Sequence, residues 1–231
     1  MNSLPAPLLL SESGFVLNGD STNLLKMFPP ESVDLILTDP PYGIDYSPKR
    51  RGKIRNDTPK RATQLFHQLV LEASRILKPG GCCITFCFSG GKPTLFPQWV
   101  TEMERILDYK ATLVWDKCVT GRGAHYRHQF EFILVAKKLG APCVWNGDGT
   151  QSRLIRVLKK FPDESDHPTP KPVKLLSHLI ALHSKRGQIV LDPFAGHGST
   201  LLAAQQLGRK FIGVELDRSF SAKIVRNLRQ S

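Results

Sequence analysis

Short apolar runs rich in Val, Ile, Leu and Phe alternate along the chain with longer segments in which apolar residues recur at helical spacing. Such alternation predicts an α/β fold with a mostly parallel sheet and helices on both faces. Continuous apolar runs also suit strands that are buried on both sides. We expect seven strands, at Phe15–Leu17, Val33–Thr38, Cys82–Phe88, Ala111–Trp115, Phe130–Ala136, Ile189–Leu191 and Phe211–Glu215.

Helical spacing is clearest in three segments. Apolar residues recur from Leu65 to Leu77, and the sequence Lys78-Pro79-Gly80-Gly81 then ends that helix. A second helix is expected to begin near Pro172, whose ring suits a first helical turn. The third covers Arg218–Arg229.

Two long stretches, residues 44–62 and 142–170, lack strong periodicity and are rich in polar or helix-breaking residues. Loops of that length inside a compact domain are usually functional. We therefore expect a single domain over residues 1–231 in which these two stretches are insertions that meet the substrate.

Composition adds a partner and a compartment to this picture. The 231 residues include 32 Lys and Arg against 20 Asp and Glu, a net charge of +12 that favours a polyanionic partner. The first ten residues lack a basic region, and no stretch of about eighteen apolar residues occurs, so we expect a cytoplasmic protein without a membrane segment. Cys82, Cys83 and Cys87 fall in one apolar run rather than at metal-ligand spacing, which predicts buried thiols and no metal site.

The strongest local signal is Thr38-Asp39-Pro40-Pro41-Tyr42, directly after the apolar strand at residues 33–37. Ligands of open α/β sheets bind at the carboxyl ends of strands. Two prolines hold the backbone extended, so the Asp39 carboxylate and the Pro40 carbonyl could together accept the hydrogens of an exocyclic base amine. That would localise the nitrogen lone pair, and the Tyr42 ring could stack on an extruded base. The alternative is a rigid turn with a capping Asp.

A second signal is the segment Asp192–Thr200, a strand end followed by Phe194, a glycine turn and a helix start. Glycines let backbone N–H groups approach a ligand, and a helix N-terminus favours a carboxylate. Glu215 closes the next strand at the separation expected of an acid that binds ribose hydroxyls. These residues predict an adenosine-containing cofactor, and NAD and S-adenosylmethionine both fit them.

Taken together, the motifs resemble the DNA amino-methyltransferases, in the class whose catalytic motif precedes the cofactor motif. Residues 39–42 look like the catalytic tetrad of that family, and residues 192–200 are similar to its methionine-binding turn, with His197 where a small residue is more usual. Residues 167–172 look like the segment before the turn, and Gly19-Asp20 is similar to the acid beside the cofactor adenine. The resemblance spans about Leu17 to Phe220.

This resemblance implies a Rossmann-like methyltransferase fold, S-adenosylmethionine as cofactor and direct methyl transfer to an amine of a base in double-stranded DNA. Asp rather than Ser at the head of the tetrad favours adenine N6, with cytosine N4 as the alternative. The implied catalytic residues are Asp39, Pro40, Pro41 and Tyr42. The implied cofactor residues are Asp20, Lys171, Asp192, Phe194, Ala195, Gly196, Gly198, Ser199, Thr200 and Glu215.

Basic residues cluster at three places where DNA phosphates could bind. The first cluster directly follows the tetrad and includes Arg50, Arg51, Lys53 and Arg55. A second, mixed with aromatic residues, includes Arg122 and Arg127, and a third includes Arg153, Arg156, Lys159 and Lys160. The alternative for each is a solvated basic surface.

Two function classes compete with DNA methylation at this point, an NAD-dependent oxidoreductase and a DNA-binding module that has lost catalysis. The sequence also leaves open whether the chain acts as a homodimer and whether a restriction endonuclease is its partner in the same system.

Overall fold

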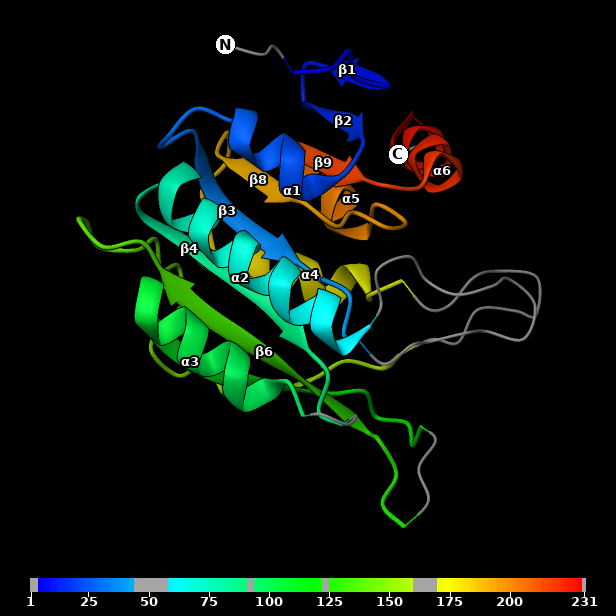
Figure 1. The fold of residues 1–231 in the computed structure, drawn as a ribbon. Helices are drawn as coiled ribbons and strands as arrows, with labels where there is room; N and C mark the ends of the chain where they lie inside the picture. The colour runs from blue at the N-terminus through cyan, green and yellow to red at the C-terminus, as the bar shows by residue number, and fades with distance from the viewer. Residues whose placement is uncertain (1–3, 44–57, 91–93, 122–124, 160–169, 230–231) are drawn as a thin grey trace.

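The computed structural model describes residues 4–43, 58–90, 94–121, 125–159 and 170–229 (Figure 1). The strands are β1 Leu9–Ser11, β2 Gly14–Asn18, β3 Val33–Thr38, β4 Leu77–Cys87, β5 Asp108–Asp116, β6 Phe130–Lys137, β7 Leu154–Arg156, β8 Ile189–Asp192 and β9 Lys210–Glu215. The helices are α1 Ser21–Leu24, the 3-10 turn η1 Leu25–Met27, α2 Pro59–Ile76, α3 Phe96–Ile106, α4 Val173–His183, α5 Ser199–Gln206 and α6 Arg218–Arg229.

All the described strands join one sheet in the order β1-β2-β9-β8-β3-β4-β6-β5-β7. The pairs from β2 through β9, β8 and β3 to β4 are parallel, whereas β6 runs antiparallel to both β4 and β5. In Figure 1 the strands β3, β8 and β9 therefore point to the same side of the molecule. Any ligand site at strand ends has to be built at that edge.

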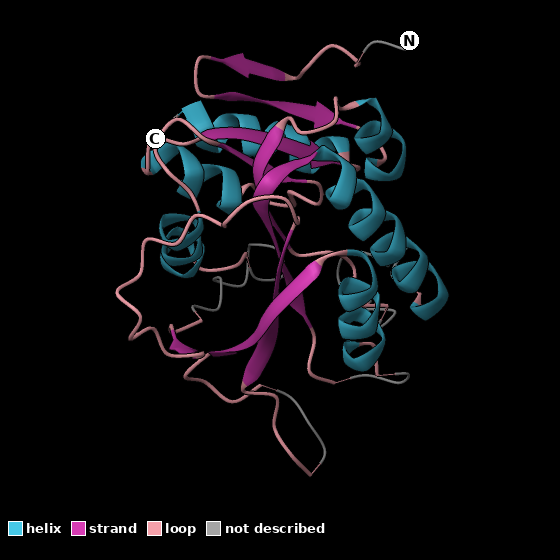
Figure 2. Cartoon of the chain, turned by 90° about the vertical axis from the view of Figure 1, so that its left-hand side faces the viewer, coloured by secondary structure: helices cyan, strands magenta, loops and turns pink. Residues whose placement is uncertain are grey.

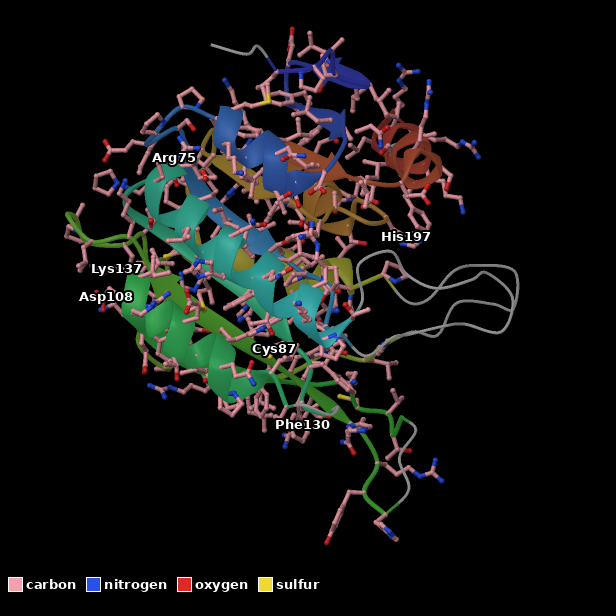
Figure 3. The ribbon with its side chains drawn as sticks, in the orientation of Figure 1. Arg75, Cys87, Asp108, Phe130, Lys137 and His197 are labelled. Atoms are coloured by element: carbon pink, nitrogen blue, oxygen red, sulfur yellow. The ribbon has the colours of Figure 1, made fainter. Side chains whose placement is uncertain are left out.

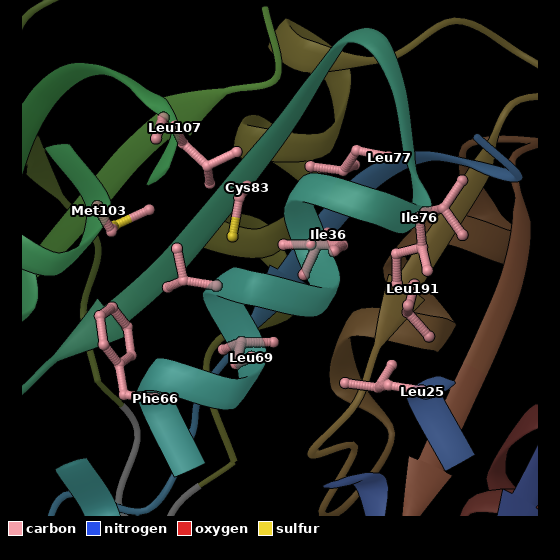
Figure 4. Close-up of a cluster of buried hydrophobic side chains, with 14 of the residues drawn as sticks. Leu25, Ile36, Phe66, Leu69, Ile76, Leu77, Cys83, Met103, Leu107 and Leu191 are labelled. Atoms are coloured by element: carbon pink, nitrogen blue, oxygen red, sulfur yellow. The ribbon is translucent and has the colours of Figure 1, made fainter. Parts of the chain in front are cut away.

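Helices cover both faces of the sheet (Figure 2), and an apolar cluster of buried residues lies on each face. On one face, Phe66 and Leu69 of α2 and Met103 of α3 pack over Ile36 and Cys83 (Figure 4). The opposite layer contains apolar residues of α4, α5 and α6. Because central strands are covered on both faces, Leu35, Ile36 and Leu37 are all fully buried.

Helix α2 shows how local sequence sets an element. The Thr58 side chain accepts a hydrogen bond from the Arg61 N–H, and Pro59 occupies the first helical turn, where its missing N–H costs nothing. The helix ends at Ile76, directly before the predicted stop at residues 78–81. The residues of that stop already belong to β4, which begins at Leu77 and pairs in parallel with β3.

Side chains tie β3 to β8 at both ends. At the start of β3, the Asp34 carboxylate accepts a 2.9 Å hydrogen bond from the Ile189 N–H and pairs with Lys78 at 2.8 Å. At the end of β3, the Thr38 hydroxyl donates a 2.7 Å hydrogen bond to Asp192. The carboxyl ends of these two strands are therefore held side by side.

The predicted α/β architecture is confirmed, with differences in detail. The sheet has nine strands rather than seven, because β1 and β7 are three-residue edge strands too short to give a periodic pattern. Strand β7 falls inside the stretch 142–170 that we expected to be loop, and the last residues of the stretch 44–62 already belong to α2. Helix α3 was not predicted, although its amphipathic face buries Trp99 and Met103.

Candidate active site

The segment Asp39–Tyr42 leaves the carboxyl end of β3, the strand next to β8. Thr38 and Asp192, joined by their hydrogen bond, are both buried. The two signals that the sequence analysis singled out, the tetrad and the glycine turn, therefore start from adjacent strand ends. Pro40 is buried, whereas the neighbouring Asp39 is partly exposed and can be reached from solvent.

The glycine turn follows β8 and leads into α5 at Ser199. Gly196 and Gly198 have φ of 52° and 81°, a conformation that favours glycine. A Cβ on Gly198 would lie 2.9 Å from Ile224 of α6, so this glycine serves packing. A Cβ on Gly196 would meet only the Phe194 carbonyl, at 3.9 Å, so this glycine borders open space. Figure 3 places His197 at the edge toward which β3, β8 and β9 point.

Two acids lie beside the turn. Glu215, at the end of β9, accepts 2.8 Å hydrogen bonds from the backbone N–H groups of Gly196 and Asp217. Asp20 caps α1 by accepting from Thr22, and lies 3.8 Å from Arg61. The neighbouring Gly19 N–H donates to the Glu215 carbonyl at 3.0 Å. The segment near the N-terminus thus joins the C-terminal strands at one site.

Burial changes the acidity of the turn. It raises the pKa of Asp192 to about 6, although hydrogen bonds from Thr38 and Thr200 act in the opposite direction. Burial also raises the pKa of Glu215. Both carboxylates are costly to keep charged without a polar or cationic partner.

These features fit the methionine and ribose ends of S-adenosylmethionine. The donor set combines carboxylates suited to an ammonium group and to ribose hydroxyls with the backbone N–H groups at the start of α5, which suit a carboxylate. Gly196 leaves space above the turn that any side chain would fill.

Asp39 lies in a network of hydrogen bonds and ion pairs. Its carboxylate accepts hydrogen bonds from the Tyr42 hydroxyl and the Lys171 ammonium, which are both mostly buried. Burial and the nearby Asp39 raise the pKa of Tyr42 well above 10, so its hydroxyl stays protonated and donates. Burial alone would lower the pKa of Lys171, but Asp39 and Glu131 outweigh it and raise that pKa, so the ammonium stays charged.

Glu131 of β6 is the functional candidate that the sequence analysis missed. It pairs with Lys171 and with Lys117, each at 3.2 Å. Burial would raise the pKa of Glu131, but the two lysines lower it well below its usual range. The sequence analysis gave Phe130–Ala136 only as a strand, and within it Glu131 is buried on the same face as Ile133 and Val135. A single acid within a continuous apolar strand is the signal that could have identified it.

An aromatic contact links the tetrad to the β5–β6 hairpin. The Tyr42 ring stacks on Phe88 with centroids 5.9 Å apart, and Phe88 lies 5.0 Å from the His128 ring. Arg127 and the largely exposed Tyr126 come directly before His128. The hairpin that carries the second basic cluster is therefore linked to the tetrad through His128 and Phe88.

The predicted DNA-contacting residues are only partly described. Arg127 is exposed, and its guanidinium donates to the Gly121 carbonyl at 3.5 Å. Arg156, on the edge strand β7, pairs with Asp116 at 3.5 Å. Outside the described residues lie Arg50, Arg51, Lys53, Arg55, Arg122 and Lys160.

The structure places nearly all the predicted cofactor residues at the carboxyl edge of β2, β9 and β8. Lys171 is the one that stands apart, because its ammonium contacts Asp39 and Glu131 instead of the turn. The predicted burial of Cys82, Cys83 and Cys87 is confirmed, and burial raises the pKa of each thiol to about 12.

In the described part of the chain, no three or more His, Cys, Asp or Glu side chains gather where they could hold a metal ion. Within the same residues, no helix combines the length and the apolar character needed to cross a membrane.

Comparison with known proteins gives consistent matches. A family model for N6/N4 DNA methylases matches residues 33–226. The DNA adenine methyltransferase YhdJ of Escherichia coli is 31% identical over 94% of this chain and 83% of its own length. The type II methyltransferase M2.DpnII of Streptococcus pneumoniae is 28% identical over 89% and 85% of the two chains. The crystal structure of the M1.HpyAVI–SAM complex superposes with a TM-score of 0.70, at 27% identity and covering 92% and 98%.

Proposed function

The chain belongs to the N6/N4 DNA methylase family, and on that premise we propose that it methylates the N6 amine of adenine in double-stranded DNA. It is a DNA amino-methyltransferase that uses S-adenosylmethionine, as the match to a SAM-bound relative supports. The adenine assignment goes further. It is supported by Asp39 at the head of the tetrad and by the likeness to YhdJ, a DNA adenine methyltransferase.

One observation carries the mechanism, namely that Asp39 and the glycine turn leave adjacent strand ends. S-adenosylmethionine supplies an electrophilic methyl group on a sulfonium sulfur. Asp192, Glu215 and the backbone N–H groups after Gly198 are the groups that would hold it. A methyl donor at the turn and an amine held by Asp39 would then be neighbours, as direct transfer requires.

The protein's task at the target base is to make a weak nucleophile reactive. The lone pair of an exocyclic amine is delocalised into the ring, so the nitrogen has little nucleophilic character. The Asp39 carboxylate and the Pro40 carbonyl would each accept a hydrogen bond from one N–H of the amine. These two hydrogen bonds would localise the lone pair on nitrogen. Tyr42 would support the extruded base with its ring.

DNA would approach across the tetrad. His128 contacts Phe88, which stacks on Tyr42, and Tyr126 and Arg127 directly precede His128 in the same hairpin. A basic side chain there would bind phosphates close to the reacting base. The stretches 44–62 and 142–170 remain our candidates for further DNA contacts.

Two further proposals concern assembly, and both remain predictions. One is a homodimer, and the other is a restriction endonuclease partner in the same system.

Mass analysis of nucleosides tests the target base. Duplex DNA is treated with the protein and S-adenosylmethionine carrying a deuterated methyl group, then digested to nucleosides. We expect labelled N6-methyladenine. Labelled N4-methylcytosine in its place would refute the adenine assignment and keep the family chemistry, whereas labelled 5-methylcytosine would contradict both.

A further inference from the structure

Four charged side chains from distant parts of the sequence form one ion-paired group that includes the aspartate of the tetrad. They are Asp39 after β3, Lys117 after β5, Glu131 in β6 and Lys171 before α4. The side chains of Glu131 and Lys117 are only 7% and 8% exposed, and that of Lys171 only 12%. Asp39, at 35%, is the member that a substrate can reach.

Lys171 donates to the acceptor that the proposed mechanism assigns to the target amine. Its Nζ bonds to Asp39 Oδ2 and also lies 3.3 Å from the Tyr42 hydroxyl. An amine that arrives at Asp39 must therefore compete with an ammonium group that is already bound. If Asp39 were the sole counter-ion, withdrawing the ammonium from it would leave a buried positive charge unpaired, which is strongly unfavourable.

Glu131 offers Lys171 a second counter-ion within the same contact distance. Its Oε2 lies 3.2 Å from Lys171 Nζ, while its Oε1 lies 3.2 Å from Lys117 Nζ. Each oxygen thus meets one ammonium group, and Lys117 fixes the carboxylate from the other side. Lys171 can release Asp39 and stay neutralised without leaving its site.

We propose that Glu131 is a positioning residue for methyl transfer, acting through Lys171: it retains the ammonium when the target amine takes over Asp39. The proposal rests on the proposed function. It assigns Glu131 no contact with the substrate or the cofactor. Its effect is to lower the free energy needed to separate the Lys171 ammonium from Asp39, so that the amine of the target base can bind there.

The test starts from a double variant that leaves the net charge of the buried group unchanged. Glu131→Gln combined with Lys117→Met removes one charge of each sign and takes the second counter-ion from Lys171. Its matched reference is Lys117→Met alone, in which Glu131 still serves Lys171. We expect kcat of the double variant to fall at least about tenfold below the reference, because the buried ammonium now has only Asp39. KM for DNA should change less than about twofold, because phosphate contacts hold the duplex.

A double-mutant cycle tests the route through Lys171. In a Lys171→Met background, adding Glu131→Gln should leave kcat unchanged within about twofold. Glu131→Asp provides an independent variant that keeps the charge and withdraws the carboxylate by one methylene, and it should lower kcat with little effect on KM. Circular dichroism and thermal melts establish that each variant is folded, and Glu131→Asp decides the question if the double variant is not.

The outcomes separate this inference from the proposed function. Equal kcat in the double variant and in Lys117→Met would overturn it. An undiminished loss of kcat on adding Glu131→Gln to the Lys171→Met background would also overturn it. A rise in KM at constant kcat would also overturn it. The unsubstituted protein is assayed alongside, and failure of that protein to methylate DNA would refute the proposed function itself.

Discussion

The hydroxyl of Thr38 donates a hydrogen bond to the carboxylate of Asp192, across 154 positions of sequence. It joins the residue before Asp39, the proposed catalytic residue, to the first residue of the glycine turn. Because both are buried, the start of the tetrad and the start of the turn are held together by the folded sheet. The proposed methyl transfer draws on this arrangement of the two strand ends.

The charge on Asp192 should lower the stability of the fold and favour cofactor binding. Its pKa of about 6 lies above the ordinary 3.8, so the folded chain binds this proton more tightly than the unfolded chain. The stabilisation is fully present below pH 3.8 and is lost as the pH rises through 6. At pH 8 the buried charge then costs on the order of 3 kcal/mol.

Asp192→Asn keeps an acceptor for Thr38 and removes that charge. We expect its free energy of unfolding in urea at pH 8 to exceed that of the parent by up to about 3 kcal/mol, and the difference to vanish below pH 4. Calorimetry should show weaker S-adenosylmethionine binding, since a carboxylate near the methionine ammonium is lost. A variant that is less stable than the parent at pH 8 would contradict this reasoning.

The two turn glycines should fail in different ways. Gly198→Ala forces a Cβ to 2.9 Å from Ile224 and should lower the melting temperature clearly, and by less in an Ile224→Ala background, which lacks the side-chain atoms nearest to that Cβ. Gly196→Ala meets only the Phe194 carbonyl at 3.9 Å, so its stability loss is limited to backbone strain of about 1 kcal/mol. Its main effect should be on cofactor affinity in calorimetry. Equal affinity loss in both variants would remove the distinction.

The neighbourhood of Asp39 and Asp192 could be predicted from sequence because both end parallel strands, and such ends gather at one edge of a sheet. The partners of Lys171 could not. Asp39 lies 132 positions before it, and a position near the cofactor turn was equally compatible with the sequence. Glu131 was predictable in principle, since a charge on the buried side of a strand needs a partner.

The short elements were beyond the sequence pattern for a different reason. Strands β1 and β7 have three residues each, fewer than two repeats of a strand's alternation. They form because β2 and β5 offer unpaired edges, which is a property of the folded sheet.

His183 should make the fold acid-sensitive. Its Nδ1 is buried without a partner in the described part of the chain, and burial lowers its pKa to about 4 from 6.5. The unfolded chain therefore takes up this proton first, so stability is complete above pH 6.5 and falls as the pH drops toward 4. In urea titrations, the acid-induced loss in the free energy of unfolding should be smaller by roughly 3 kcal/mol in His183→Leu than in the parent. His125→Gln, in the exposed hairpin, is the control; a parent-like slope in His183→Leu would refute the assignment.

Arg127 should contribute to DNA affinity without sequence preference. Arg127→Ala should weaken binding to any duplex and reduce the slope of log affinity against log salt by about one. Fluorescence anisotropy over a salt series measures both. Arg105→Ala on α3, an exposed arginine paired with Glu102 at 2.9 Å, is the matched control. Identical salt slopes for the two variants would remove Arg127 from the interface.

If Asp39 activates a base amine beside the bound methyl donor, the Asp39→Ala variant should lose methyl transfer but keep its fold and its DNA binding. In this variant Glu131 still neutralises Lys171, so the protein should stay folded and bind duplex DNA within about threefold of the parent. Transfer of radiolabelled methyl from S-adenosylmethionine to DNA should fall at least roughly 100-fold. Undiminished methyl incorporation by the folded Asp39→Ala protein would show that Asp39 takes no part in the reaction.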